Sequence, residues 1–319
     1  MIAEERAALA RLCATVHWDA DMGAYSTFRT GGRVDALVDV QDLEELGSLL
    51  SWLQGQGISW RLIGGGSNIL VASPRVEGVF LRLKGGFCQA RKLPDAPTAF
   101  GTGLVRAGAG CSLPRLVRCC SLEGLGGLEW AVGIPGTVGG ALRMNAGAYG
   151  GTISHQLSRV SVIAPAGSDS NSGVWKVEQL GAEQIDFGYR SSRFPGAGPG
   201  EQPVIVSADF ILDQAEPEDI RNREKEYSRQ RRASQPQGTG FSAGSFFKNP
   251  PGESAGRLIE AAGLKGLEQG DAQVSCCHAN FIVNRGQATP GEIITLMKRV
   301  QQGVADSAGV VLEPEVVIL

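Results

Sequence analysis

The sequence contains one stretch that decides the fold, Gly133-Ile-Pro-Gly-Thr-Val-Gly-Gly140-Ala-Leu-Arg-Met-Asn145-Ala-Gly-Ala-Tyr-Gly150-Gly151. Its glycines are too frequent for a stable helix or a plain strand. Such a run can wrap a flat ligand with polar edges by presenting main-chain amides and carbonyls. An irregular surface loop is the alternative. The stretch and the residues just before it are too apolar for a free loop, because they include Trp130, Ile134, Val138, Leu142 and Met144.

A second glycine cluster, Ile63-Gly-Gly-Gly-Ser-Asn68, lies between apolar segments. Consecutive amides without side-chain bulk form a nest that suits a pyrophosphate, and Ser67 and Asn68 add side-chain hydrogen bonds. The cluster matches neither the Gly-x-Gly-x-x-Gly fingerprint nor the Gly-x-x-x-x-Gly-Lys-Ser/Thr loop. A tight turn without a ligand explains this segment equally well, so it does not decide the function alone.

The composition is that of a packed, soluble chain. The 319 residues favour two domains, at roughly 100–200 residues per domain. Hydrophobic residues make up 42% and charged residues 20%, which argues against disorder. The 45 glycines are about twice the ordinary share of roughly 7% and sit in clusters, which indicates backbone devices. A net charge of −3 without a basic run argues against a nucleic-acid partner.

Targeting, membrane and metal signals are weak. The N-terminus, Met1-Ile-Ala-Glu-Glu-Arg6, lacks the basic and apolar regions of a signal peptide. No stretch approaches the roughly 20 apolar residues of a membrane span. We therefore expect a cytoplasmic protein without membrane insertion. The seven cysteines form no Cys-x-x-Cys and include two adjacent pairs, which favours reduced, buried thiols. The three histidines are scattered, so no metal site is predicted.

Periodicity and capping signals predict an α+β chain, strand-rich in the first two thirds. The polar segment 216–235 is expected to be a solvated helix and marks the boundary between two domains. The other expected helices span 42–53, 112–120, 254–263 and 289–300, with Asp42, Ser112, Ser254 and Thr289 as N-caps. The expected strands span 34–40, 61–63, 79–83, 104–108, 160–164, 175–180, 204–212, 279–283 and 310–319, the last interrupted by Pro314.

Three polar motifs follow the glycine clusters. They are Phe187-Gly-Tyr-Arg190, Gly244-Ser245-Phe-Phe-Lys248-Asn249-Pro250 and Leu312-Glu-Pro-Glu315-Val316. Taken singly, a surface salt bridge, a turn cap and a solvated edge strand explain them at least as well as a catalytic role. A hydrolase triad does not fit, because Ser245 lacks the Gly-x-Ser-x-Gly setting and no histidine is marked as its base.

In order along the chain, the segments together resemble one family, UDP-N-acetylenolpyruvoylglucosamine reductase (MurB). Each motif is weak alone, but the ordered set extends from residue 27 to residue 316 and is specific. The matching segments are Thr27-Phe-Arg-Thr-Gly-Gly32, Gly64-Gly-Gly-Ser-Asn68, Gly133-Ile-Pro-Gly-Thr-Val-Gly-Gly140, Met144-Asn-Ala-Gly-Ala-Tyr-Gly150, Gly188-Tyr-Arg190, Gly244-Ser-Phe-Phe-Lys-Asn-Pro250, His278-Ala-Asn-Phe-Ile-Val-Asn284 and Leu312-Glu-Pro-Glu-Val316.

The resemblance implies an FAD-binding domain of the vanillyl-alcohol-oxidase (PCMH) type over residues 1–213, in two α+β lobes. A smaller α+β substrate-binding domain would follow over 214–319, with 310–319 as a candidate strand to complete the first domain. The chain resembles the subgroup that lacks a tyrosine-bearing insertion between Arg190 and Ser245. The segment 268–273 departs from the more hydrophobic run that is common in the family.

In function, the resemblance implies reduction of the enolpyruvyl ether of UDP-N-acetylglucosamine to UDP-N-acetylmuramate, with FAD as cofactor and NADPH as reductant. This step belongs to peptidoglycan precursor synthesis, and hence to cell-wall biogenesis, cell shape, cell division and the cell cycle. The partner would be a small-molecule UDP-sugar, and we expect a monomer. Another FAD-dependent oxidoreductase of the same fold, or a non-catalytic flavin- or nucleotide-binding protein, remains the alternative.

Residue roles carry over by motif. Arg190, Ser245 and Glu315 match the catalytic residues, and Asn249 matches a substrate contact, with Lys248 beside it. An arginine fork suits the substrate carboxylate, Ser245 would give a proton to the carbanion, and Glu315 would help to spread its charge. The residues expected to contact FAD are Arg29, Gly64, Gly65, Gly66, Ser67, Asn68, Gly133, Ile134, Pro135, Gly136, Thr137, Gly139, Gly140, Asn145, Ala146, Gly147 and Tyr149.

Overall fold

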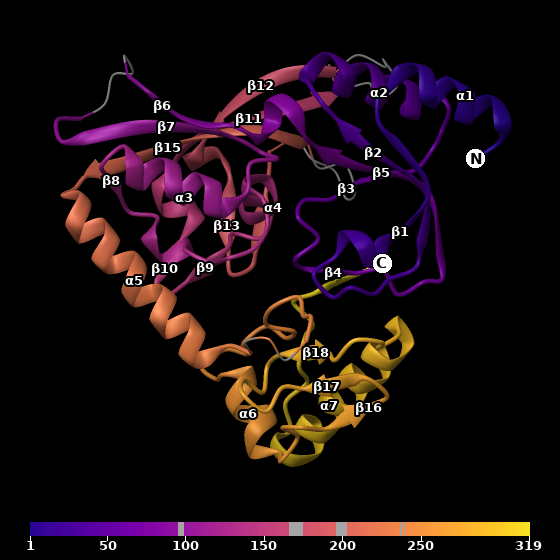
Figure 1. The fold of residues 1–319 in the computed structure, drawn as a ribbon, viewed down its shortest axis with the longest axis vertical. Coiled ribbons are helices and arrows are strands. Elements are labelled where there is room, and N and C mark those ends of the chain that lie inside the picture. The colour runs from indigo at the N-terminus through magenta and orange to yellow at the C-terminus, as the bar shows by residue number, and fades with distance from the viewer. Residues whose placement is uncertain (95–98, 166–174, 196–202, 237, 239) are drawn as a thin grey trace. The chain divides into compact units, whose positions relative to one another are not determined.

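The computed structural model describes residues 1–94, 99–165, 175–195, 203–236, 238 and 240–319 (Figure 1). These residues pack as two compact units. Unit 1 comprises Met1–Trp18, Ala36–Gly64 and Gly78–Arg229, and unit 2 comprises Asp19–Asp35, Gly65–Glu77 and Gln230–Leu319. Among the described residues, no helix combines the length and the apolar character needed to cross a membrane.

Helices and mostly antiparallel strands occur in separate runs along the chain, as in an α+β protein. The α-helices are α1 (Ala3–Leu12), α2 (Leu43–Gly55), α3 (Leu113–Leu122), α4 (Val138–Arg143), α5 (Pro217–Ser234), α6 (Ala255–Ala261) and α7 (Pro290–Ala308). The strands are β1 (Val16–Asp21), β2 (Arg33–Val40), β3 (Trp60–Leu62), β4 (Ile69–Leu70), β5 (Arg75–Leu83), β6 (Ala90–Leu93), β7 (Thr102–Gly108), β8 (Leu125–Gly126), β9 (Gly147–Ala148), β10 (Gly151–Thr152), β11 (Leu157–Pro165), β12 (Trp175–Gly181), β13 (Asp186–Gly188), β14 (Ser191–Arg193), β15 (Val204–Gln214), β16 (Glu268–Gln269), β17 (Ala272–Val274), β18 (Ile282–Asn284) and β19 (Val317–Ile318).

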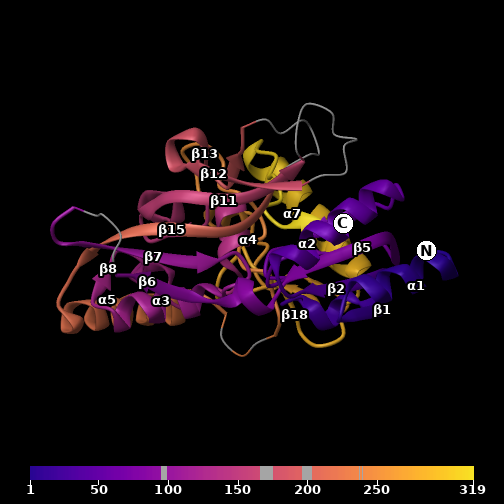
Figure 2. The same cartoon turned by 90° about the horizontal axis from the view of Figure 1, so that it is seen from above.

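The largest sheet lies in unit 1 and has the strand order β12-β11-β15-β7-β6, with β8 paired to the end of β15. All of its pairs are antiparallel. Along β15 the valine, alanine and phenylalanine side chains are buried, because β-branched and aromatic residues pack well on a sheet surface. In Figure 2, α3 runs along one side of β7 and β15. Leu113, Leu116, Val117 and Cys120 form its buried face.

A smaller sheet has the order β1-β2-β5-β3. Helix α2 follows β2, and β3 then pairs in parallel with β5, with Trp60 opposite Val79. The side chain of Asp42 accepts a hydrogen bond from the Glu45 amide at 2.9 Å, which confirms the predicted N-cap of α2. Leu46, Leu49, Leu50 and Leu53 of α2 are buried in the core of unit 1, whereas Leu43 at its start is exposed.

Unit 2 combines the sheet β16-β17-β18 with α6 and α7. The predicted caps Ser254 and Thr289 are confirmed, and Thr289 forms a full capping box with Glu292. A separate core contains Phe28 and Leu70 from early segments and the inward faces of α6 and α7, including Ile259, Leu296 and Val300. This unit therefore closes only when three distant parts of the chain meet.

Two strand predictions in this region are wrong in extent. The predicted strand 279–283 pairs only as β18 (Ile282–Asn284), because the preceding residues are used in a turn where the Phe281 amide bonds to the His278 carbonyl. The predicted strand 310–319 reduces to β19 (Val317–Ile318) and one bridge at Pro314. Proline has no N–H to offer a ladder, so pairing around it changes partner.

Candidate active site

Ser245 lies on a turn that two buried phenylalanines anchor. Gly244 adopts φ +80°, a conformation that favours glycine, immediately before the serine. Phe246 and Phe247 are fully buried and their rings lie 5.2 Å apart, and Phe246 also meets Phe28 edge-on. The half-buried Ser245 hydroxyl therefore stands at the edge of a rigid apolar base.

The C-terminal segment runs beside this turn. The Glu315 amide donates to the Phe246 carbonyl at 2.8 Å, and the Lys248 amide donates to the Glu313 carbonyl at 2.8 Å. Phe247 and Pro314 form the bridge between these two bonds. Unit 2 thus brings two of the three predicted catalytic residues, Ser245 and Glu315, onto neighbouring strands of backbone.

Asn68 fixes the same C-terminal segment from the other side. Its side-chain amide donates to the Glu315 carbonyl at 3.1 Å, and its own carbonyl accepts from the Val317 amide at 3.0 Å. The parallel pairing of β19 with β4 continues this contact. The predicted cofactor residue Asn68 therefore also holds Glu315 in place.

Asn280 is a positioning residue to which the sequence analysis gave no role. Asn280 is 4% exposed, and its side chain forms two hydrogen bonds with the backbone of Phe247. Its Oδ1 accepts from the Phe247 amide at 2.9 Å, and its Nδ2 donates to the Phe247 carbonyl at 2.8 Å. Its carbonyl accepts from the Phe246 amide at 2.7 Å. The signal was present, because Asn280 stands in the quoted segment His278-Ala-Asn-Phe, but nothing in that pattern shows which backbone it would bind.

The two predicted substrate residues have partners inside the protein. The ammonium group of Lys248 pairs with the carboxylate of Glu313. The Asn249 side-chain oxygen accepts from the Ala255 amide at 3.0 Å, at the start of α6. Both side chains are therefore held close to the Ser245 turn by contacts within unit 2.

Arg190 lies in unit 1, in the turn between β13 and β14. It adopts φ +54°, and its guanidinium donates to the Gly147 carbonyl at 3.1 Å and lies 5.5 Å from the Tyr189 ring centre. Asn145 closes the same contact, because its side-chain amide donates to the Gly188 carbonyl at 3.0 Å. The structure therefore brings Arg190 together with the predicted flavin loop 145–149.

Backbone strain coincides with the predicted site. Among the described residues, five non-glycine residues have positive φ, and four of them are predicted site residues: Arg29, Asn145, Tyr149 and Arg190. Such conformations cost of order 1–3 kcal/mol each and cluster at ligand-binding sites. Tyr149 is further held by a stacked contact with Tyr227, with ring centres 5.2 Å apart.

The glycine stretch uses many of its amides internally. The amides of Ile134, Val138 and Gly139 donate to the carbonyls of Ala131, Cys111 and Ala109. The amide of Gly140 donates to the Thr137 hydroxyl at 3.4 Å. These four amides therefore already have hydrogen-bond partners in the protein. Thr137 also limits the space at the other glycine cluster. A Cβ on Gly64 would lie 2.5 Å from the Thr137 hydroxyl oxygen, so any other residue at position 64 would force Thr137 to shift.

Two buried polar atoms in unit 1 fit a bound cofactor with polar edges. The side-chain oxygen of Asn145 and the indole nitrogen of Trp130 are buried and have no hydrogen-bond partner among the residues that the structure describes. Leaving a buried donor or acceptor unmet costs about 1–3 kcal/mol each. Gly151 lies against the Trp130 ring, where a Cβ would come within 2.4 Å of it. A flavin ring offers both acceptors and donors, so the residues present fit FAD.

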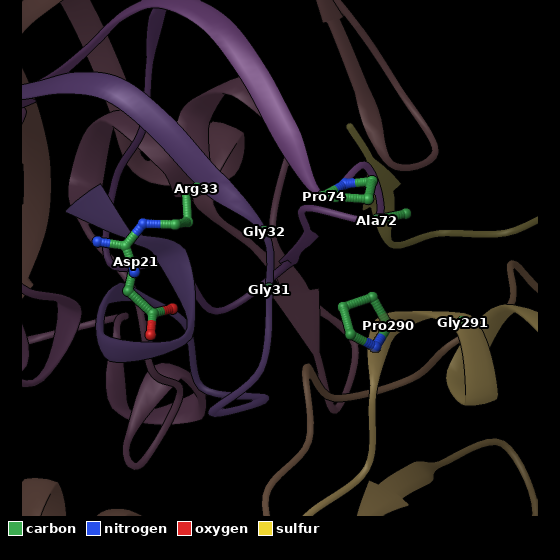
Figure 3. Close-up of a pocket in the computed structure, with 8 residues that line it drawn as sticks. All are labelled: Asp21, Gly31, Gly32, Arg33, Ala72, Pro74, Pro290 and Gly291. Atoms are coloured by element: carbon green, nitrogen blue, oxygen red, sulfur yellow. The ribbon is translucent and has the colours of Figure 1, made fainter. Parts of the chain in front are cut away.

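A separate hollow in unit 2 contains none of the predicted site residues. It encloses about 520 Å³ and is lined by Asp21, Gly31, Gly32, Arg33, Ala72, Pro74, Pro290 and Gly291. In Figure 3, Arg33 and Asp21 lie on one side and Pro290 on the other. Arg33 is paired with Asp19 at 2.8 Å, and Asp21 accepts from the Gly23 amide at 2.9 Å. Its two charged side chains therefore already have partners in the protein.

Family models match both parts of the chain. A model of an FAD-binding domain matches residues 34–169, and a model of the C-terminal domain of UDP-N-acetylenolpyruvoylglucosamine reductase matches residues 235–319. The matched ranges cover both glycine-rich segments, 64–68 and 133–151, and the Ser245 turn.

Similar proteins extend over almost the whole length. UDP-N-acetylenolpyruvoylglucosamine reductase 2 of Symbiobacterium thermophilum is 44% identical over 294 residues, covering 92% of this chain and 89% of that protein. The reductase of Geobacter metallireducens is 40% identical, covering 94% and 93%. The crystal structure of the reductase from Thermus caldophilus is 36% identical with a TM-score of 0.75, covering 94% of this chain and 97% of that one. The predicted fold class is confirmed.

Proposed function

The chain belongs to the UDP-N-acetylenolpyruvoylglucosamine reductase family, and we propose that it reduces the enolpyruvyl ether of UDP-N-acetylglucosamine to UDP-N-acetylmuramate with NADPH as reductant. It is an FAD-dependent oxidoreductase of peptidoglycan precursor synthesis. The observation that carries the proposal is the pairing of the Ser245 turn with the Glu315 segment within unit 2.

The residues that would hold FAD are the two glycine segments, 64–68 and 133–140, and the loop 145–149. Asn145 and Trp130 would direct their unmet side-chain atoms at it. When bound and reduced by NADPH, the flavin would supply the hydride for the methylene carbon of the enolpyruvyl group. Everything else in the reaction falls to side chains: binding the carboxylate, spreading charge and delivering a proton.

We assign carboxylate binding to Arg190. A guanidinium matches a carboxylate with two parallel N–H donors and keeps its charge at any working pH. The bond to Gly147 and the ring of Tyr189 orient the fork, so little conformational freedom is lost when the substrate binds.

We assign proton delivery to Ser245. Hydride addition leaves negative charge on the carbon that bears the carboxylate, and the product needs one proton at that carbon. The Ser245 O–H would break as the new C–H bond forms, and the alkoxide would then regain a proton from solvent. A serine hydroxyl is a weak acid, so the nearby Lys248 and Asn249 would stabilise the alkoxide.

Glu315 would support the developing charge. A carboxyl group that keeps its proton in a desolvated site can donate a hydrogen bond to the substrate carboxylate. Its backbone is fixed from both sides, by Phe246 and by Asn68, which limits how far the side chain can move away.

The test is a two-step mixing experiment with the purified flavoprotein. NADPH alone should bleach the flavin absorbance, and the enolpyruvyl substrate should restore it while mass spectrometry detects UDP-N-acetylmuramate. Oxygen restoring the band as fast as the substrate would favour an oxidase of the same fold. A flavin band that NADPH bleaches but the substrate never restores would overturn the proposed reaction.

We also propose that residues 1–213 form the FAD-binding region and that residues 214–319 form the substrate-binding domain. The positions of the two family models support it. We further propose that the enzyme acts as a cytoplasmic monomer, where its nucleotide substrates are found. Light scattering on the FAD-loaded protein tests the oligomeric state directly.

A further inference from the structure

The chain carries two adjacent cysteine pairs in contrasting settings. Cys119 and Cys120 lie on α3, where Cys120 is buried and Cys119 half-buried. Burial raises the pKa of both thiols above the ordinary value, which keeps them protonated and unreactive. Cys276 and Cys277 lie on a turn after β17, and both are exposed. The second pair is therefore the accessible dithiol of the protein.

The turn that carries Cys276 and Cys277 is held from beneath by Ser275. The Ser275 hydroxyl is buried and accepts hydrogen bonds from the amides of Cys277 at 3.1 Å and His278 at 3.3 Å. The sulfur of Cys276 lies over Gly266, since a Cβ there would be 3.4 Å from it. The two cysteines therefore lie on a defined turn that the two hydrogen bonds to the Ser275 hydroxyl hold in shape.

A short chain of contacts leads from this turn to Ser245. The Asn280 amide donates to Nδ1 of His278 at 3.2 Å. The Asn280 side chain in turn forms hydrogen bonds with the backbone N–H and C=O of Phe247, two residues after Ser245. Any change at residues 275–278 that moves His278 will therefore reach the segment that presents the serine.

We propose that Cys276 and Cys277 form a dithiol site that captures trivalent, thiophilic arsenic, and that its occupation displaces Ser245. The second half rests on the proposed function. With an arylarsenoxide the step balances without redox change: two S–H bonds break, two As–S bonds form, and the oxide oxygen leaves with both protons as water. Soft thiolates are the ligands that such an acceptor prefers.

Capture requires the turn to change shape. Side chains of consecutive residues diverge from the backbone, so both sulfurs can reach one atom only if the peptide between them rotates. That peptide carries the Cys277 N–H, so its rotation breaks the hydrogen bond from this amide to the Ser275 hydroxyl and disturbs the neighbouring bond from His278. A misplacement of a catalytic group by about 1 Å can cost about 10²-fold in rate.

The chemistry is tested with phenylarsine oxide on the FAD-loaded protein. Intact mass should show one adduct, which peptide mapping places on residues 276–277, and a dithiol should reverse it while a monothiol at equal thiol concentration should not. Cys276→Ser and Cys277→Ser should each lose the dithiol-specific adduct. The matched control Cys119→Ser/Cys120→Ser should behave as the unmodified protein does. An adduct that persists in Cys276→Ser/Cys277→Ser would overturn the site.

The coupling is tested by rapid mixing. The adduct should slow flavin reoxidation by the enolpyruvyl substrate about 10²-fold and leave reduction by NADPH nearly unchanged. The variant Cys276→Ser/Cys277→Ser should keep normal reoxidation in the presence of the arsenical. An adduct with unchanged reoxidation would overturn the coupling. If the adduct maps to residues 276–277 but the unmodified protein does not turn over the enolpyruvyl substrate, the dithiol site is supported and the proposed function is wrong.

Discussion

The backbone amide of Glu315 donates to the carbonyl oxygen of Phe246 over 2.8 Å, although the two residues are far apart in the sequence. This bond places Glu315 beside the serine that precedes Phe246. The bridge at Phe247 and Pro314 extends the contact by one more pair. Two chemically different groups, a hydroxyl and a carboxyl, are thereby presented from one rigid platform, and their separate removal should give separate kinetic signatures.

Replacement of Ser245 by alanine should impair only the substrate half of the reaction. Loss of one well-placed proton donor costs roughly 10²–10⁴-fold in rate. Stopped-flow absorbance should show flavin reduction by NADPH unchanged and reoxidation by the enolpyruvyl substrate slowed by that factor. Ser242→Ala, three residues earlier on the same segment, is the control and should be nearly normal. Equal damage to both half-reactions would contradict the role given to Ser245.

Glu315→Gln should cause a smaller loss than Ser245→Ala. The amide keeps hydrogen-bonding capacity but cannot present a carboxylic O–H, so we expect reoxidation to slow about tenfold. Glu260→Gln serves as the control, because Glu260 is an exposed glutamate of α6 that pairs with Lys265, a residue without a role in the site. A reoxidation rate equal to that of the unmodified enzyme would remove Glu315 from the mechanism.

Arg190→Lys should weaken the transition state for the carboxylate substrate. A lysine keeps the charge but loses the planar fork, and one charged hydrogen bond is worth about 1.5–3 kcal/mol, or roughly 10- to 150-fold in kcat/KM. Steady-state kinetics should show this loss, with the NADPH-dependent bleaching rate kept. Arg193→Lys, on the exposed side of β14, is the matched control. The role of Arg190 fails if the two variants behave alike.

Gly66→Ala should destabilise unit 2 far more than its conformation alone predicts. Gly66 has φ +66° and a Cβ there would lie 1.9 Å from the Tyr25 carbonyl oxygen. Gly57 has φ +64° but open space around it, so Gly57→Ala isolates the conformational cost of about 1–2 kcal/mol. Denaturant unfolding should show a further loss of about 2 kcal/mol or more for Gly66→Ala. The FAD content of the purified protein should fall with it, and equal losses would refute the clash.

Asp39 should stabilise the fold only above acidic pH. Burial by itself would raise the pKa of Asp39, but the bonds and charges of Arg82 and His17 outweigh it and lower this pKa overall. Because the folded-state pKa lies below the unfolded value of about 3.9, the contribution is full above that pH and disappears as pH falls through the folded value.

The change to test is Asp39→Asn, which leaves Arg82 without its charged partner. Urea unfolding at pH 7 should show a loss of about 2 kcal/mol, and the difference from the unmodified protein should shrink below about pH 4. Asp213→Asn, at an exposed position on β15, should change little at either pH. A loss that is the same at pH 7 and at pH 3 would show that packing, not charge, is responsible.

Local signals in the sequence predicted α2, α3, α5, α6 and α7. Helix α1 was not predicted, and the glycine stretch, expected to form no stable helix, contains α4 (Val138–Arg143) behind the cap Thr137. Asp42, Ser112, Ser254 and Thr289 each cap the helix expected from them, because a cap depends on residues within one turn of the chain. The strand 310–319 could not be predicted in extent. Its pairing depends on Asn68 and Phe246, which are distant in sequence, and on Pro314, whose missing N–H prevents a continuous ladder.

The sequence proposes residues for the candidate site but does not show their contacts. The ordered motifs pointed to Arg190, Ser245 and Glu315, but no pattern shows that Asn280 holds Phe247 or that Asn68 holds Glu315. The glycine stretch was expected to offer its amides to a ligand, whereas those of Val138 and Gly139 bind protein carbonyls. Hydrogen-bond partners are settled by tertiary packing, which composition and spacing do not encode locally.

The three-part make-up of unit 2 has a consequence for synthesis on the ribosome. Phe28 and Leu70 emerge early, yet the residues that cover them, on α6, α7 and the final segment, are translated last. Until the C-terminal residues are synthesised, β4 cannot pair with β19, and the side chains of Phe28 and Leu70 remain exposed to solvent. The nascent protein should therefore need shielding by a chaperone during the last part of translation, and a premature stop codon after residue 229 should yield an aggregating product.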